Sequence, residues 1–114
     1  MHEMSIALNV VEIACQQAVG AGADKVESIT LEIGDLAGVM LDSLEFCFPS
    51  ACKGTIAAEA VLKVDRVAGE GHCLECDAHF PVESFITICP ECEQYRVEIL
   101  HGRELRVKSI MVND

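Results

Sequence analysis

The sequence predicts a two-layer α/β domain, with a small sheet of about three strands and two helices, into which a zinc-ribbon-like module is inserted. Three observations predict it. Apolar residues recur at helical spacing near the N-terminus, shorter segments alternate apolar and polar residues, and two Cys-x-x-Cys pairs lie close together. Amphipathic helices and half-apolar strands bury their apolar faces against one another, which gives two layers. We place the α/β domain at residues 1–69 and 102–114, and the zinc-binding module at residues 70–101.

Two segments are expected to form helices. Residues 4–19 carry apolar side chains three or four positions apart, and Gly20-Ala21-Gly22 supplies a stop signal. The apolar stripe consists of Met4, Leu8, Val11, Cys15 and Ala18, widened by Ile6, Val10 and Ile13. Asp42 and Glu45 resemble a capping box that would begin a second helix, and Lys53-Gly54 would end it.

Three segments are expected to form strands. In residues 26–33, Ile29, Leu31 and Ile33 alternate with polar residues, the pattern of a half-buried strand. Residues 60–65 repeat this pattern. Residues 104–112 form a last strand, which we expect to return to the main sheet. Because the chain has four Phe, one Tyr and no Trp, its core should be mostly aliphatic.

The charge of the chain limits its partners. Eight Lys and Arg residues against 19 Asp and Glu residues give a formal net charge of −11. Such a surface repels a phosphate backbone, so we expect no nucleic-acid partner. The N-terminal segment lacks the basic residues of a secretory signal, and no apolar run approaches the ~18 residues that span a bilayer. We therefore expect a cytoplasmic protein that makes no membrane contact.

The seven cysteines call for an explanation other than disulfides, which are rare in the cytosol. Cys15, Cys47 and Cys52 lie among apolar residues and are interpreted as small buried hydrophobes. The others form two Cys-x-x-Cys pairs, in each of which a tight turn aims both sulfurs at one ion. Two such turns complete a tetrahedron of soft ligands that suits Zn(II). The predicted ligands of this structural zinc are Cys73, Cys76, Cys89 and Cys92.

Two other interpretations of these pairs stay open. A redox-active Cys-x-x-Cys usually opens a helix in a βαβ unit, which the pattern here does not predict. A rubredoxin-like iron site uses the same ligands, and the protein would then be red. His72 and His79 flank the first pair. We interpret them as surface or hydrogen-bonding residues that could exchange for a thiolate.

The chain begins Met1-His2-Glu3, which suggests a second metal site. The terminal amine, a backbone amide and the imidazole of His2 can chelate one ion through fused small rings, and the next amide or a carboxylate completes a square plane. Square-planar nitrogen ligation favours Cu(II) or Ni(II). The alternative is that His2 is an ordinary residue at a frayed chain end.

The chain resembles the HypA/HybF family of hydrogenase-maturation nickel metallochaperones over nearly its whole length. The joint occurrence of an N-terminal Met-His-Glu, a Cys-x-x-Cys and a Cys-Pro-x-Cys makes the resemblance specific. The segments that carry it are Met1-His2-Glu3-Met4-Ser5-Ile6, Ile29-Thr30-Leu31-Glu32-Ile33-Gly34, Leu44-Glu45-Phe46, the two cysteine pairs and Gly102-Arg103-Glu104-Leu105-Arg106-Val107-Lys108.

The resemblance implies a metallochaperone that binds Ni(II) as cargo at its N-terminus, with His2 as the essential side chain and Met1 and Glu3 beside it. It implies a structural zinc at the four cysteines. The implied partners are a HypB-type GTPase, the large-subunit precursor of NiFe hydrogenase and, in some members, urease maturation proteins. We expect a monomer or a weak homodimer.

The alternative function is a zinc-ribbon protein-interaction adaptor without nickel delivery. An adaptor that binds nucleic acid is disfavoured by the negative charge. A redox role would need iron or a titratable thiol pair at the cysteines. The sequence offers no Gly-rich phosphate loop, no nucleophile–base pair and no open three-ligand zinc site, so we expect no enzyme activity.

Overall fold

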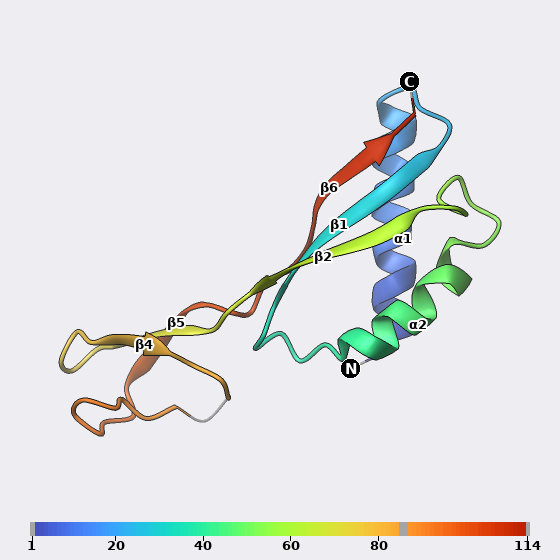
Figure 1. The fold of residues 1–114 in the computed structure, drawn as a ribbon. Helices are drawn as coiled ribbons and strands as arrows, with labels where there is room; N and C mark the ends of the chain where they lie inside the picture. Colours follow the sequence, from blue (N-terminus) through green and yellow to red (C-terminus); the bar gives the residue numbers. More distant parts are fainter. Residues whose placement is uncertain (1, 85–86, 114) are drawn as a thin grey trace. The chain divides into compact units, whose positions relative to one another are not determined.

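The structure is a computed structural model, in which residues 2–84 and 87–113 are described. Its elements are, in chain order, α1 (Glu3–Gly20), β1 (Val26–Gly34), α2 (Leu41–Cys52), β2 (Val61–Val67), β3 (Glu70–Cys73), β4 (His79–Pro81), β5 (Val97–His101) and β6 (Leu105–Val112) (Figure 1). They divide between two compact units. The sheet unit comprises Met1–Glu32, Val39–Asp65 and Arg106–Asp114, and the cysteine unit comprises Ile33–Gly38 and Arg66–Leu105. The domain boundaries given above stay a prediction.

The sheet unit is built on a three-stranded sheet with the order β2-β1-β6. Figure 1 shows β1 in the middle, with α1 and α2 beside the sheet. β6 runs antiparallel to β1, because Asn113 donates its backbone N–H to the carbonyl of Lys25 at one end and Arg106 pairs with Glu32 at the other, at 2.9 Å. The predicted return of the last strand to the sheet is confirmed. So is the predicted fold class, a small sheet with two helices and a module that carries the cysteine pairs.

The core of the sheet unit is aliphatic, as predicted. Ile29 and Leu31 of β1 are fully buried, and Leu44 of α2 joins them. The exposed ion pair between Arg106 and Glu32 lies on the sheet, where the Arg106 guanidinium holds the pKa of the Glu32 carboxyl below its usual value. No helix in the described part of the chain is long and apolar enough to cross a bilayer.

The buried face of α1 differs from the predicted stripe. Met4 and Leu8 are 40% and 53% exposed, whereas the face turned inward is rich in alanine. The buried residues are Ala7, Val10, Val11, Ala14 and Ala18. α1 packs against α2. The predicted stripe was wrong at these positions, because it placed the larger Met4 and Leu8 inside and left out Ala7 and Ala14.

The predicted start of α2 is wrong by two residues, because the N-cap is Met40 and not Asp42, and its capping chemistry also differs. The helix begins at Leu41, and its N-cap residue, Met40, makes no side-chain cap. Asp42 is therefore not the cap. The backbone N–H of Met40 instead donates to Oε2 of Glu3, at 3.2 Å. A carboxylate from α1 thus satisfies a donor that a local capping box would have satisfied.

The cysteine unit contains a second three-stranded sheet, with β3 between β4 and β5. Both neighbours are antiparallel to β3, and Gly71 faces Phe80 on one side and Ile99 on the other. One face of the sheet covers a small core. It contains Leu36, Cys73, Phe80, Val82 and Cys89, with Ala78, Cys92, Val97 and Ile99 packed against it. Such a core is too small to stabilise a fold alone, so we expect a bound metal to contribute.

Replacing Gly71 by alanine should destabilise the cysteine unit. A Cβ there would lie 2.8 Å from Cγ2 of Val82 and 2.9 Å from Cγ1 of Val97, both on branched side chains that cannot turn away easily. We expect the free energy of unfolding to fall by about 1–3 kcal/mol, as for overpacked cores, measured by chemical denaturation. Gly20→Ala is the control, because a Cβ at residue 20 would meet nothing within 4 Å and stability should not fall.

Candidate metal centre

The first cysteine pair forms a tight turn between β3 and β4. Cys73 is the last residue of β3, and its backbone N–H donates to the carbonyl of Ala78, at 2.9 Å. The N–H of Asp77 donates to the carbonyl of Cys73, also at 2.9 Å. A third N–H, of Glu75, donates to Sγ of Cys73 at 3.4 Å. The turn therefore fixes the position of one sulfur and partly neutralises its charge.

The second pair repeats these hydrogen bonds one for one. Cys89 donates its N–H to Gln94 and accepts from the N–H of Glu93, both at 2.9 Å. Glu91 donates its N–H to Sγ of Cys89 at 3.4 Å. The two tetrapeptides Cys-Leu-Glu-Cys and Cys-Pro-Glu-Cys, which differ only at their second residue, thus adopt one local structure. This supports the prediction that both turns aim their sulfurs at one ion.

The residue after each pair has a left-handed backbone. Asp77 has φ 62° and Glu93 has φ 61°, and they are the only described residues other than glycine with positive φ. For a residue other than glycine, this left-handed backbone conformation costs about 1–2 kcal/mol. No pattern in the sequence marks this strain, because glycine, the usual indicator, is absent from both positions.

Glu93→Gly should therefore stabilise the metal-loaded protein. Glycine makes the unfolded chain more flexible, which lowers stability by roughly 0.5–1 kcal/mol. The relief of backbone strain is larger, so we expect the free energy of unfolding to rise by roughly 0.5–1 kcal/mol. The matched control is Glu91→Gly in the same turn, where φ is not positive and stability should fall. Denaturant unfolding of the two variants provides the comparison. A loss of stability in both would contradict the strain.

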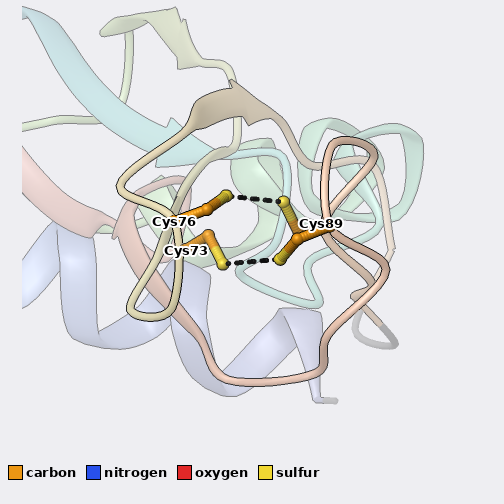
Figure 2. Close-up of side chains that lie close together, drawn as sticks. Cys73, Cys76 and Cys89 are labelled. Carbon is orange, nitrogen blue, oxygen red and sulfur yellow. Dashed lines mark hydrogen bonds between the residues drawn. The ribbon is translucent and has the colours of Figure 1, made fainter.

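The four predicted cysteines come together in space. Their sulfurs all lie within 4.8 Å of one another, with Cys73 3.5 Å from Cys92 and Cys76 3.6 Å from Cys89. Figure 2 shows Cys73 and Cys76 facing Cys89. Bonds of about 2.3 Å to a tetrahedral Zn(II) place sulfurs roughly 3.8 Å apart, close to what is seen. A disulfide needs about 2.05 Å, and all seven cysteines are free. The group has the donors and the spacing to hold a metal ion.

The two sulfurs of each pair differ in burial. Cys73 and Cys89 are fully buried in the small core, whereas Cys92 is half-buried and Cys76 is exposed. One side of the tetrahedron therefore rests on the protein and the other faces solvent. An ion could enter and leave from the side of Cys76.

The thiols also differ in acidity. Burial raises the pKa of Cys89, but the backbone N–H groups of Cys92 and Glu91 and the neighbouring thiols lower it to about 7. The N–H of Ala78 lowers the pKa of Cys76, whereas burial and the other three thiols raise it to about 12. Four thiolates repel one another, and a divalent cation removes this repulsion.

The other three cysteines lie in the sheet unit. Cys52 is buried, as predicted, and Cys15 and Cys47 are half-buried. Burial raises the pKa of Cys52 to about 11. A thiol with such a pKa is a poor nucleophile and a poor metal ligand, which agrees with its interpretation as a small hydrophobe.

Of the three predicted nickel ligands, the structure describes His2 and Glu3. Met1 lies outside the described residues. His2 is exposed and occupies the N-cap position of α1, where its side chain makes no cap hydrogen bond. Glu3 begins α1 and accepts the hydrogen bond from Met40.

The comparisons with known proteins agree with this arrangement. Residues 1–112 match the family described as "Hydrogenase/urease nickel incorporation, metallochaperone, hypA". The chain belongs to this family. A HypA-family relative from Chlorobaculum tepidum, named hydrogenase maturation factor HypA, is 47% identical over 112 residues, which cover 98% of this chain and 99% of the relative. Another of the same name, from Parabacteroides distasonis, is 46% identical and covers 98% and 97%.

Solved structures of the HypA family share the fold. The solution structure of the Ni metallochaperone HypA from Helicobacter pylori superposes with a TM-score of 0.70 at 22% identity, covering 98% of this chain and 97% of that one. A second HypA solution structure has a TM-score of 0.73 at 23% identity, covering 99% and 97%. The resemblance seen in the sequence motifs is therefore confirmed for family and fold.

Proposed function

We propose that this chain is a nickel metallochaperone, which binds Ni(II) through Met1, His2 and Glu3 and delivers it for the maturation of NiFe hydrogenase. Its membership of a nickel-incorporation family over residues 1–112 carries the proposal. A structural Zn(II) at Cys73, Cys76, Cys89 and Cys92 completes it.

The start of α1 suits the proposed nickel chelate. The first backbone N–H groups of a helix have no acceptor within the helix. The amides of His2 and Glu3 can therefore lose their protons to a metal without breaking a helical hydrogen bond. Among the described residues, the helical bond from the N–H of Ile6 to the carbonyl of His2 involves neither amide. Nitrogen ligands in a plane favour Ni(II) or Cu(II).

The position also suits release. A cation at a helix N-terminus faces the positive end of the helix dipole, at a cost of about 0.3–1 kcal/mol. The exposed imidazole of His2 can be replaced by another ligand directly from solvent. Tight but exposed binding is what a protein needs if it is to hand its cargo to another.

The zinc is proposed as a scaffold. Four thiolates leave no open position for a substrate, in contrast to catalytic zinc. The small core around Cys73 and Cys89 supports a structural task for the metal. We accordingly propose no enzyme activity.

The partners proposed are a HypB-type GTPase and the hydrogenase large-subunit precursor, with urease maturation proteins as further partners. We place the activity in the cytoplasm, where thiols stay reduced and able to bind metal. For the chain itself we propose a monomer or a weak homodimer.

The test is nickel insertion in cells. The host's own copy of the gene is deleted and replaced by the wild-type chain or by His2→Ala, under limiting nickel. We expect the wild type to restore the nickel content of the hydrogenase and His2→Ala to leave it near the level of the deletion. Equal nickel contents with both would overturn the proposal.

One observation favours the alternative, a protein-interaction adaptor without nickel delivery. The cysteine unit exposes several large apolar side chains, among them Leu74, Ile88 and Tyr95, which are 46%, 47% and 72% exposed. Apolar side chains on a small module are typical of docking surfaces. An adaptor would support hydrogenase maturation equally well with His2→Ala.

A further inference from the structure

Three of the four histidines lie on the sheet of the cysteine unit, away from the four sulfurs. His72 on β3 pairs with His79 on β4, and their rings stack with centroids 4.8 Å apart. His101 ends β5 and pairs with Glu70, the first residue of β3. In the same strands Gly71, Cys73 and Phe80 are buried. The sheet therefore has one face of cysteine and apolar side chains and another of imidazoles and carboxylates.

Glu70 lies between two of these imidazoles. Its Oε2 is 3.4 Å from Nδ1 of His79, and its Oε1 is 3.5 Å from Nε2 of His101. The other nitrogen of His101, Nδ1, lies 3.8 Å from Oε2 of Glu104. A carboxylate that holds the free ring nitrogen is the usual way in which a metal-binding imidazole is oriented.

We propose that Glu70, His79 and His101 form a second, labile site for a divalent transition-metal ion, with Glu104 orienting His101. Two imidazoles and a carboxylate are borderline ligands that suit Ni(II), Zn(II) or Cu(II) and do not suit Ca(II) or Mg(II). The site uses none of the four thiols and no N-terminal residue, and it goes beyond the proposed function. Its residues come from β3, β4 and β5, so a bound ion would clamp the three strands together.

The side chains have to turn to close on an ion. Among the described residues, only the four cysteines have ligand atoms all within 4.8 Å of one another. The side chains of Glu70, His79 and His101 are 41%, 55% and 57% exposed, so rotation meets little packing. Surface ion pairs contribute about 0–1 kcal/mol to stability. The protein therefore loses little stability when a metal ion replaces them.

There is also room for the water that would complete the coordination. A surface hollow of about 380 Å³ is lined by Glu70 and His79, among others. A second hollow, of about 280 Å³, is lined by His101 and Glu104. Water ligands and exposed side chains make such a site weak and rapidly exchanging.

The test uses the zinc-loaded full chain with His2→Ala, which removes the N-terminal chelate. Equilibrium dialysis against Ni(II), followed by metal analysis, should find one nickel per chain beside the retained zinc. His79→Gln and His101→Gln should each weaken this binding by tenfold or more, and Glu70→Gln likewise. Glu98→Gln is the matched control, because this carboxylate lies near His72 and not near the proposed ligands, and it should change nothing.

A spectroscopic measurement locates the ion. Ni(II) should broaden the amide resonances of β3, β4 and β5 in the His2→Ala chain and not in the same chain with His79→Gln and His101→Gln combined. Absence of a second ion, or binding that survives this double change, would overturn the site. Either outcome leaves the proposed function untouched, because the function depends on the comparison of wild type with His2→Ala.

Discussion

Cys73→Ser is expected to abolish stoichiometric zinc binding and to unfold the cysteine unit. Cys73 is a fully buried sulfur whose position is fixed by hydrogen bonds from its own turn. A hydroxyl there is a poor ligand for Zn(II), and the remaining three thiols would face one another without a cation. Structural zinc contributes about 10–16 kcal/mol in small modules, which is comparable to the roughly 5–15 kcal/mol stability of a typical domain. Metal analysis and the amide spectrum measure the two consequences.

The effect should stay within the cysteine unit. The sheet unit has its own aliphatic core, which includes Ile29, Leu31 and Leu44. Its amide resonances should therefore persist in Cys73→Ser. Cys47→Ser is the control, since this half-buried thiol lies in α2 and should leave one zinc per chain. One zinc per chain in Cys73→Ser, with the cysteine unit folded, would contradict a structural role.

The features that could be predicted from the sequence are mostly local. A Cys-x-x-Cys turn depends on four neighbouring residues, so the gathering of Cys73, Cys76, Cys89 and Cys92 followed from their spacing. The alternation in residues 26–33 predicted β1 for the same reason. In both cases the residues that decide the structure lie next to one another in the chain.

The features that were missed depend on distant contacts. Glu3 accepts a hydrogen bond from the N–H of Met40, which lies 37 positions away in the sequence. No local pattern around Asp42 could show that Glu3 takes the place of a capping residue. The alanine-rich buried face of α1 is decided by what packs against the helix, not by the size of its apolar residues. The pairing of Glu70 with His101 depends on a register shift between Glu70 and Gly71, which the sequence does not mark.

His2→Ala is expected to weaken nickel binding by about 100-fold or more, equivalent to about 2.8 kcal/mol, while zinc content stays unchanged. The imidazole is the only side-chain nitrogen of the proposed chelate, and its loss opens one ring of the fused system. Because His2 makes no cap hydrogen bond, the change should not disturb α1. Calorimetric titration of tag-free protein with Ni(II) measures the affinity, and Ser5→Ala, an exposed change in the first turn, is the control.

Two related changes separate the parts of the chelate. One glycine added before Met1 moves the terminal amine away and should weaken binding as strongly as His2→Ala does. Glu3→Gln should weaken it much less, because the amide of Glu3 remains and the glutamine oxygen can still accept from the N–H of Met40. If nickel affinity survived His2→Ala and the added glycine together, the ion would have to bind elsewhere, and the N-terminal chelate would be wrong.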